Sequence, residues 1–499
     1  MKKQYLLTYD LGTSSIKCTL IEAQSGIFRV CQAAYPLFTD IDGKAEQNPA
    51  DWWRAFCTVS REAVQDLAAD SLAALCVSGQ MMSMLPMGTE GPLCPAMIWA
   101  DGRAKDGYAA LRAKVSPERI HTLTGIRPSE NYSLPKWMEF ARREPELYQR
   151  TVCFLGAKDY INYCLTGRYA TDPEEAAFML ALDLRTQAWS EELLDASGID
   201  RQKLPPVLPS GAVLGAITQA AAKACGLPCG LPVILGTGDG GAATLGAGVW
   251  EKGSAYISLG TSCWVCAAVD QAQPQPETGL NKIRYGNGYR DSGTMQCGGY
   301  VLSWLKDRLH MSFQEMGDQA MACAAGAGGV LFLPQLMGER APFWDMKLRA
   351  SFVGMTAETG TAQFCRSAVE GVGMQLRLIY QSILTANGMK EAQEIRLVGG
   401  GAESLVWRQI LADIFGLPVT VNQSCRHAGA LGTAAIAGKT VGMFSQYADI
   451  TRFYGETLYT QPQITDVYLK LIPIFQEARA ALTAIDHKLH ALQQEERIS

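Results

Sequence analysis

The sequence has no long hydrophobic run that would indicate a membrane protein. The apolar stretch near the N-terminus is interrupted by Thr8 and Asp10 after only a few residues, which is too short for the hydrophobic region of a signal peptide. No segment approaches the roughly 20 apolar residues that cross a bilayer. We therefore expect a soluble, cytoplasmic protein with no membrane partner.

Basic clusters are also missing. Lys and Arg together number 44 against 49 Asp and Glu, which gives a net charge of −5. Nucleic-acid-binding proteins usually carry a basic patch or run, and none is present in the sequence. We expect no nucleic-acid partner, and the sequence leaves open whether the chain forms a homodimer.

The sequence has no disulfide or zinc pattern, although it contains 15 cysteines. Most of them lie singly in apolar segments, where a reduced thiol is a small core residue. The closest pairs, Cys225 with Cys229 and Cys263 with Cys266, have neither a second pair nor His residues at ligand spacing. The sequence therefore predicts reduced cysteines.

The length and hydrophobic content predict two domains. A chain of 499 residues is too long for one ordinary core, and 48% hydrophobic residues can supply two interiors. We place an N-terminal domain at residues 1–248, a C-terminal domain at 249–485 and a charged tail at 486–499. The first domain should hold the acceptor and the second the nucleotide.

Strand and helix patterns alternate in the first half and predict an α/β fold. In NPADWWRAFCTVSREAVQDLA, Asn48 or Asp51 can cap a helix and Pro49 suits its first turn. The buried strand LAALCVSGQ follows and ends at Gln80. Ligands bind at the carboxyl ends of strands in such folds, so Gln80, Met81 and Met82 should lie near one.

One glycine turn occurs twice, about half the chain apart. YLLTYDLGTSSIKCTL begins at Tyr5 and AYISLGTSCWVCAAV begins at Ala255. Each reads as an apolar strand, a Gly-Thr-Ser turn and a second apolar strand, which predicts two similar halves that face each other across a cleft. Only the first copy has a carboxylate before its turn, Asp10, and this asymmetry favours a nucleotide with a metal ion.

The two turns have the residue types that bind phosphate. Glycine permits the sharp bend, and the neighbouring hydroxyl and amide groups can donate to phosphate oxygens. The candidate phosphate ligands are Gly12, Thr13, Ser14, Gly260, Thr261 and Ser262. Asp10 can hold Mg²⁺ through water, because this ion keeps much of its hydration shell. A single turn of this kind is more typical of a plain hairpin, whereas the pair favours nucleotide binding.

Asp239 is the candidate catalytic residue. It lies in GTGDGG, on a glycine-rich turn after an apolar strand, where packing explains a carboxylate poorly. As a general base it would accept the proton of an acceptor hydroxyl, an effect of roughly 10² to 10⁴ in rate. The alternative is an aspartate that stabilises its own turn through backbone amides.

A triple glycine at residues 399–401 lies between a predicted strand and a helix. It would let a nucleotide ring or ribose approach the main chain closely. No Gly-Lys-Ser/Thr follows it and the G-x-G-x-x-G spacing is absent, so it is neither a Walker A motif nor a dinucleotide fingerprint.

Together these features resemble the FGGY family of carbohydrate kinases over nearly the whole chain. The family's second signature matches ASFVGMTAETGTAQFCRSAVE, from Ala350 to Glu370, at every defined position. This signature marks the fold more than the chemistry. The resemblance implies a two-domain actin-like ATPase (ribonuclease H-like) fold with a cleft between the domains, ATP as the donor and Mg²⁺ as the metal.

Among the branches of the family, the sequence is most similar to xylulokinases in PAMIWADGRA, AKDYINYCLTGRYATD, LPQLMGERAP and VGGGAESLVWRQILAD. The resemblance implies that Asp10 is the magnesium-associated carboxylate and that Asp239 is the catalytic base. The nucleotide and phosphate ligands that it implies are Thr13, Lys17, Thr261, Gly299, Gly400 and Gly401.

The sequence departs from xylulokinases where the acceptor is chosen. Met82 replaces a histidine and Gly240 an asparagine, and Asn131 and Glu139 fit the first family signature imperfectly. Because specificity for hydroxyls depends on matched hydrogen bonds, these changes can shift the substrate away from D-xylulose. We expect a xylulokinase-like kinase for a small sugar or polyol. The alternatives are another ketose, polyol or sugar acid, such as ribulose or gluconate, and a non-catalytic sugar or nucleotide sensor.

Overall fold

The structure is a computed structural model that describes residues 4–286 and 288–498, with side chains up to residue 493. The chain divides into two compact units. Unit 1 comprises residues 4–248 and His427–Phe453, and unit 2 comprises Val249–Arg426 and residues 454–498.

Unit 1 is built on a six-stranded sheet with the order β11-β12-β6-β1-β2-β3. Its strands are β1 (Tyr5–Leu11), β2 (Ser15–Glu22), β3 (Gly26–Ala34), β6 (Leu72–Gly79), β11 (Val213–Ala216) and β12 (Pro232–Gly238). The three neighbours β12, β6 and β1 are parallel, while β1, β2 and β3 form an antiparallel meander. Every residue of β6 is buried, as expected for a parallel strand that is covered on both faces.

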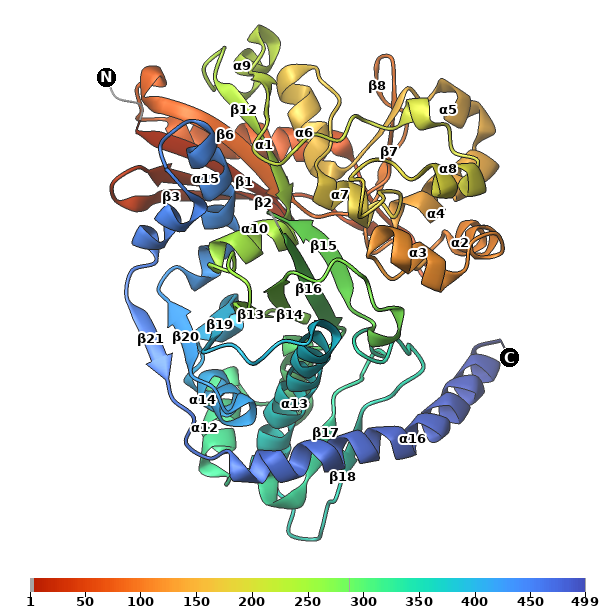
Figure 1. Cartoon of the computed structure of the whole chain (residues 1–499), viewed down its shortest axis with the longest axis vertical. Helices are drawn as coiled ribbons and strands as arrows, with labels where there is room; N and C mark the ends of the chain where they lie inside the picture. The colour runs from red at the N-terminus through yellow and green to blue at the C-terminus, as the bar shows by residue number, and fades with distance from the viewer. Residues whose placement is uncertain (1–3, 287, 499) are drawn as a thin grey trace. The chain divides into compact units, whose positions relative to one another are not determined.

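Helices cover this sheet (Figure 1). They are α1 (Pro49–Val64), α6 (Ala157–Thr166), α7 (Pro173–Phe178), α9 (Gln219–Cys225), α10 (Asp239–Gly246) and α15 (Ala428–Thr440). The predicted start of α1 is confirmed: Pro49 is its first residue, and the Asn48 side chain accepts a hydrogen bond from the Ala50 amide.

The rest of unit 1 consists of small sheets and helices. The sheet strands are β4 (Phe38–Thr39), β5 (Ala45–Gln47) and β9 (Ala96–Met97), and β7 (Leu85–Gly88), β8 (Gly91–Pro92) and β10 (Cys153–Leu155). The helices are α2 (Lys105–Arg112), α3 (Pro117–Thr124), α4 (Ser133–Arg143), α5 (Pro145–Arg150) and α8 (Glu191–Ser197).

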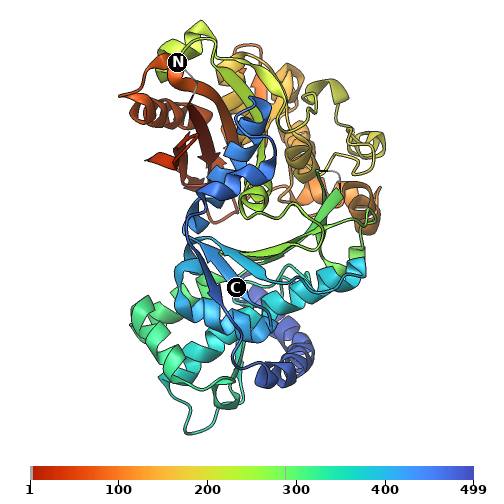
Figure 2. The ribbon, with the colours of Figure 1, turned by 60° about the vertical axis from the view of Figure 1, so that its left-hand side comes forward.

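Helix α15 comes from late in the sequence but packs within unit 1. It lies against α10, β1 and β6, so the blue helix is found beside the red strands in Figures 1 and 2. A Cβ atom at Gly432 would lie 1.9 Å from the carbonyl oxygen of Ala242, which explains the small residues of this helix. This segment falls within the predicted C-terminal domain at residues 249–485, whereas the structure assigns His427–Phe453 to unit 1.

Unit 2 has a seven-stranded sheet with the order β15-β16-β14-β13-β19-β20-β21. The strands are β13 (Ala255–Leu259), β14 (Cys263–Val269), β15 (Asn281–Tyr285), β16 (Gly288–Met295), β19 (Ile395–Val398), β20 (Val419–Asn422) and β21 (Thr457–Thr460), and a separate pair is β17 (Leu331–Leu333) and β18 (Ser351–Val353). The helices are α11 (Gly299–Leu309), α12 (Phe313–Ala322), α13 (Thr361–Asn387), α14 (Leu405–Phe415) and α16 (Asp466–Ile498).

The C-terminal segment is part of a helix in unit 2. Helix α16 continues through residue 498, and within the predicted tail Asp486 is buried and forms an ion pair with Arg479. Asp486, the first residue of the predicted tail, therefore packs on the unit as part of this helix.

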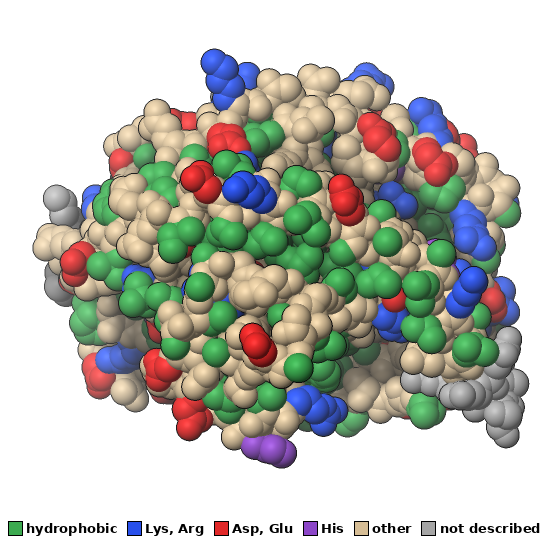
Figure 3. Space-filling model, turned by 90° about the horizontal axis from the view of Figure 1, so that it is seen from below, with side chains coloured by type: hydrophobic (Ala, Val, Ile, Leu, Met, Phe, Trp, Pro, Cys, Tyr) green, Lys and Arg blue, Asp and Glu red, His purple; other side chains and the backbone are tan. Residues whose placement is uncertain are grey.

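Three further features can be compared with the sequence predictions: the cysteines, the hydrophobicity of the helices and the charge of the surface. All 15 cysteines lie among the described residues and are reduced, as predicted. None of the helices within residues 4–286 and 288–498 is long and apolar enough to cross a bilayer. On the face in Figure 3, basic and acidic side chains are interspersed.

Candidate active site

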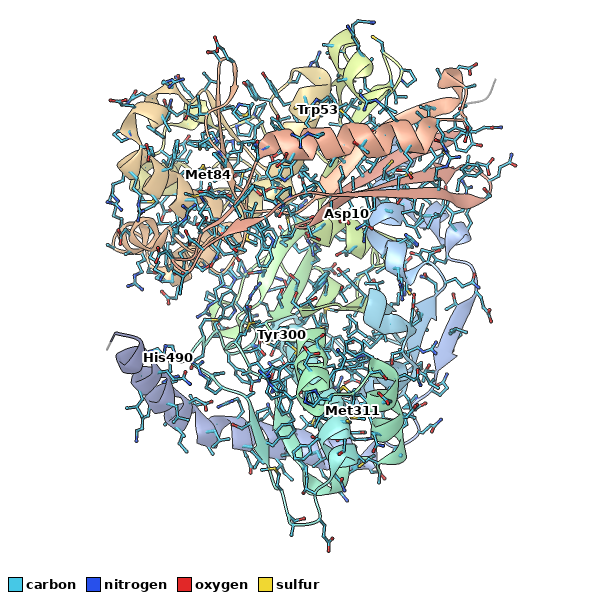
Figure 4. All side chains as sticks on the ribbon, turned by 180° about the vertical axis from the view of Figure 1, so that it is seen from behind. Asp10, Trp53, Met84, Tyr300, Met311 and His490 are labelled. Carbon is cyan, nitrogen blue, oxygen red and sulfur yellow. The ribbon has the colours of Figure 1, made fainter. Side chains whose placement is uncertain are left out.

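The ends of three parallel strands bring the predicted residues of unit 1 to one edge of the sheet. Asp10 is next to last in β1 and pairs with Ser78 of β6, and Gly79 of β6 pairs with Gly238 of β12. Gln80 and Asp239 follow directly after these strands. Asp10 is labelled at this edge in Figure 4. This is the carboxyl edge, where α/β folds bind ligands.

Asp239 is exposed and is the first residue of α10. The sequence predicted a glycine turn here, but α10 begins directly at Asp239 and its Gly241 lies in a crowded site. A Cβ atom at Gly241 would lie 1.8 Å from Oε2 of Glu174. The Gly240 amide donates a 2.7 Å hydrogen bond to Oδ1 of Asp239, so the side chain also makes the local contact that the alternative interpretation required.

The segment after β6 lies against the strand that leads to Asp239. A Cβ atom at Gly238 would lie 2.1 Å from Sδ of Met81, so the methionine packs directly on this glycine. Met82 is half-buried and Met81 is buried. This contact places Met81 next to the strand end that carries Asp239.

The first predicted phosphate turn is held by a buried glutamine, Gln47, that sequence analysis missed. Its Nε2 donates to the Thr13 carbonyl oxygen at 2.6 Å, and its Oε1 accepts from Nε2 of Gln80 at 2.8 Å. Nε1 of Trp99 donates to Oγ1 of Thr13 at 2.9 Å, and Tyr35 donates to the Gly12 carbonyl oxygen. Gln47 thus connects the turn to residues 80–82, which we call the acceptor segment. No local sequence pattern marks Gln47.

Asp10 has an environment that suits a metal ion held through water. The side chain is half-buried, and burial raises the pKa of its carboxyl group, while the nearby Lys17 opposes this shift. Lys17 is exposed and lies opposite Asp10 in the hairpin. Magnesium is commonly held by one or two carboxylates together with water and substrate phosphates, so a single carboxylate at this position fits the ion.

The second predicted phosphate turn, residues 260–262, lies in unit 2 and is fixed by the start of α11. The amide of Gly299 donates to the Gly260 carbonyl oxygen at 2.9 Å. The amides of Gly298 and Tyr300 donate to the Thr261 carbonyl oxygen at 3.1 and 3.0 Å. Tyr300 is labelled at this helix start in Figure 4. These bonds orient the turn. Glycine is needed before Tyr300 because a Cβ atom at Gly298 would lie 2.1 Å from Sγ of Cys263, and one at Gly299 would lie 2.5 Å from the Gly260 carbonyl oxygen.

A cavity of about 420 Å³ in unit 2 is lined by five of the six nucleotide residues that were predicted in this unit. Gly260, Thr261, Gly299, Gly400 and Gly401 all line it, whereas Ser262 is outside the lining set. Its apolar wall is formed by Leu302, Phe313, Met316, Val406 and Trp407. An apolar cavity of this size with a few polar groups is typical of a small-molecule or cofactor site.

Glycine keeps this cavity open at the triple-glycine segment. A Cβ atom at Gly400 would meet no atom within 4 Å, so a side chain there would extend into free space. Gly399 has a φ of 89° and a Cβ atom there would lie 2.7 Å from the Leu259 carbonyl oxygen. The main chain can therefore approach a ligand closely only with glycine at these positions.

A buried carboxyl group, Glu339, lies near the second turn and was not predicted. Its Oε1 accepts hydrogen bonds from the amides of Gln296 at 2.7 Å and Arg340 at 2.9 Å. Burial raises the pKa of Glu339 to about 7. The residue belongs to LPQLMGERAP, so family resemblance was the only sequence signal that pointed to this segment.

Comparison with known proteins finds that both parts of the chain match domains of the same family. Residues 5–246 match the N-terminal domain of the FGGY family of carbohydrate kinases, and residues 255–441 match its C-terminal domain. The xylulose kinase of Lactococcus lactis is 29% identical over 502 residues, which cover 97% of this chain and 98% of that protein.

Solved structures of two kinds of kinase are equally similar to the structure of this chain. The gluconate kinase and the ligand-bound xylulose kinase of Lactobacillus acidophilus each superpose with a TM-score of 0.91 at 27% identity, covering 97% of this chain and 99% of theirs. The predicted two-domain α/β fold is confirmed by these neighbours.

Proposed function

Because the chain belongs to the FGGY family of carbohydrate kinases, we propose that it transfers the γ-phosphoryl group of ATP to a hydroxyl of a small neutral ketose or polyol. D-xylulose is the first candidate. The observation that carries the proposal is the common sheet edge of Asp10, Gln80 and Asp239, since a base and an acceptor site must lie side by side.

In this proposal Asp239 is the general base. The Gly240 amide orients its carboxylate, and the exposed side chain can reach a bound hydroxyl. As the hydroxyl oxygen bonds to the γ-phosphorus, Asp239 takes the hydroxyl proton. The bond between that phosphorus and the β–γ bridging oxygen breaks, and ADP leaves with the bridging oxygen.

The nucleotide is proposed to occupy the unit 2 cavity. The apolar wall would contact the base, and Gly299, Gly400 and Gly401 would allow close approach of the main chain. Phosphate contacts would come from Thr261 and Ser262, and from Gly12, Thr13, Ser14 and Lys17 of the first turn. Asp10 would hold Mg²⁺, which neutralises phosphate charge when bound.

The side chains proposed for the acceptor favour a neutral substrate. Gln80 offers an amide, Met81 and Met82 offer thioethers, and Asp239 carries the carboxylate. None of these four groups carries a positive charge that could form an ion pair with an anionic substrate. Gluconate is the second candidate, and the similarity to the gluconate kinase of Lactobacillus acidophilus supports it.

The test is a coupled ADP-release assay on the purified full chain with ATP and Mg²⁺. D-xylulose, D-ribulose, xylitol and gluconate are supplied separately, and mass spectrometry identifies any phosphorylated product. We expect a ketose or polyol to give the highest kcat/KM. Preference for gluconate would overturn the neutral-acceptor assignment, and binding of a sugar without any product would favour the sensor alternative.

A further inference from the structure

The acceptor segment contains a residue in a strained backbone conformation. Met82 has a φ of 64°, in the left-handed region that non-glycine residues rarely adopt. Such a conformation is unfavourable for a residue with a Cβ atom and persists only when surrounding groups enforce it. The groups that enforce it at Met82 therefore determine the shape of the predicted acceptor site.

Two buried residues with ionisable side chains bind the main chain of Met82, one at its amide and the other at its carbonyl oxygen. Oε1 of Glu175, in α7, accepts a 3.2 Å hydrogen bond from the Met82 amide. Nζ of Lys136, in α4, donates to the Met82 carbonyl oxygen at 3.1 Å and to that of Ile98 at 2.6 Å. Both side chains are fully buried. The next residue is also held, because the hydroxyl of Ser133 donates to the Ser83 carbonyl oxygen at 3.1 Å.

Glu175 belongs to a larger buried cluster of charges. Nζ of Lys158 lies 2.6 Å from Asp159, 2.7 Å from Asp172 and 3.9 Å from Oε2 of Glu175. Burial raises the pKa of Asp159 and of Glu175, because one lysine cannot neutralise several carboxylates away from water.

Placing charged groups in the interior is costly, and apolar residues of similar volume often give equal or greater stability. Lys136 shows the same cost, since burial lowers its pKa to about 7. Stability alone is therefore a poor explanation for this arrangement. A requirement for fixed geometry at the Met82 main chain explains it better.

The position of Met82 bears on the proposed chemistry. Its neighbour Met81 packs on Gly238, immediately before Asp239, so a change in the backbone at Met82 would also move a side chain beside the proposed base. Gln80, two residues earlier, is tied through Gln47 to the first phosphate turn. A fixed backbone here would align the acceptor with both groups.

We propose that Glu175 and Lys136 are positioning residues of the acceptor site, which hold the Met82 main chain in its left-handed conformation and so set the affinity for the sugar. The inference rests on the proposed function, because it assigns the acceptor to this segment. Neither residue is a catalytic residue, since each acts through the backbone of Met82.

The test compares Glu175→Ala with Glu175→Gln in steady-state kinetics on the full chain. Alanine removes the acceptor of the Met82 amide, so KM for the sugar should rise about tenfold or more, while KM for ATP should stay within about twofold. Glutamine keeps a side-chain oxygen and should restore most of the affinity. Ser133→Ala, a smaller change that should fold, is expected to raise the sugar KM by about threefold to tenfold.

A backbone rescue separates positioning from general stability. Glycine adopts the left-handed region readily, so Glu175→Ala should cost less sugar affinity in a Met82→Gly background than in the wild type. Asp413→Ala is the matched control, because Asp413 of unit 2 is buried and accepts hydrogen bonds from the amides of Gln463 and Ile464. This control should lower Tm without changing the sugar KM.

The outcomes distinguish failure of the inference from failure of the function. If the wild-type protein phosphorylates none of the acceptors, the proposed function is wrong. If the wild type is active but Glu175→Ala and Ser133→Ala leave the sugar KM unchanged, or raise the KM values of sugar and ATP equally, the positioning role is wrong.

Discussion

At the scale of single residues, Asp239 provides the most direct test of the chemistry. Replacing it with Asn keeps the size and most of the local hydrogen bonding but removes the proton acceptor. We expect Asp239→Asn to bind ADP normally and to lose about 10² to 10⁴ in kcat. Calorimetric ADP titration and the coupled assay measure the two properties.

The matched control for this variant is Asp195→Asn, which changes an exposed aspartate of α8 in the same unit. It should retain wild-type turnover. Near-normal kcat in Asp239→Asn would remove this residue from the role of general base.

Glu339 makes a prediction about stability and pH. Its pKa is raised from 4.5 to about 7 in the folded protein by burial, with the Gln296 and Arg340 amides opposing the shift. A carboxyl group with a raised folded-state pKa stabilises the fold below its unfolded pKa, and this contribution is lost as the pH rises from about 4.5 to about 7. Between pH 5 and pH 8 the loss should be about 2 to 3 kcal/mol.

Urea unfolding of wild type and Glu339→Gln at pH 5 and pH 8 measures this contribution. The variant should lose less stability than wild type over this interval, because glutamine does not titrate. Glu358→Gln changes an exposed carboxyl group of the same unit and should behave like wild type. The nearby thiols of Cys263 and Cys297 have pKa values of about 11, so they do not titrate in this interval.

Residues differ in how far their roles could be predicted from the sequence. Asp10 and Asp239 were found because each is a carboxylate at the end of an apolar strand, with glycine one or two residues away. Gln47, Lys136 and Glu175 were not found, since they act through side-chain contacts with segments 33 to 93 residues away. Nothing in their local sequence distinguishes such residues from ordinary helix or strand positions.

At the scale of secondary-structure elements, the contact between α10 and α15 depends on glycine. A Cβ atom at Gly432 would lie 1.9 Å from the Ala242 carbonyl oxygen, and one at Gly246 would lie 1.7 Å from that of Ala428. We expect Gly432→Ala to destabilise unit 1 by about 1 to 3 kcal/mol, because neither backbone can move away without disturbing the sheet. Urea unfolding measures the change.

Gly429→Ala is the control on the same helix. A Cβ atom at Gly429 would meet no atom within 4 Å, so alanine should be neutral or slightly stabilising through its higher helix propensity. Equal stability of the two variants would show that the close contact tolerates a side chain.

The elements were predicted well where a local signal exists. The two hairpins, α1 and β6 follow from apolar patterns, capping residues and glycine positions. The start of α10 was missed because Gly238, Gly240 and Gly241 are typical of a turn. Gly238 and Gly241 are required by tertiary contacts with Met81 and Glu174, and sequence patterns carry no information about such contacts.

At the scale of the whole molecule, the repeated glycine turn correctly indicated two α/β halves, but not their exact composition. The return of His427–Phe453 to unit 1 could not be predicted, because a small-residue helix specifies close packing without specifying its partner. The 420 Å³ cavity proposed for the nucleotide is in unit 2, whereas the proposed acceptor residues Gln80 and Asp239 are in unit 1, together with Asp10 and the first phosphate turn.

This distribution predicts that each ligand stabilises a different unit. A ligand that binds only the folded state stabilises it by RT ln(1 + [L]/Kd), about 2.7 kcal/mol at one hundred times Kd. In differential scanning calorimetry of the full chain, ADP should raise the transition of unit 2 and the acceptor should raise that of unit 1. Limited proteolysis during heating assigns each transition to its unit.

Gly400→Val tests whether the ADP effect arises in the cavity. Because the space beside Gly400 is open, valine should fold normally but occupy volume needed by the nucleotide. The variant should lose the ADP-dependent shift and keep the acceptor-dependent one, whereas Gly429→Ala should keep both. An undiminished ADP shift in Gly400→Val would place the nucleotide outside this cavity, and the phosphate turn at Gly260 and Thr261 would then lack the binding site that it is proposed to complete.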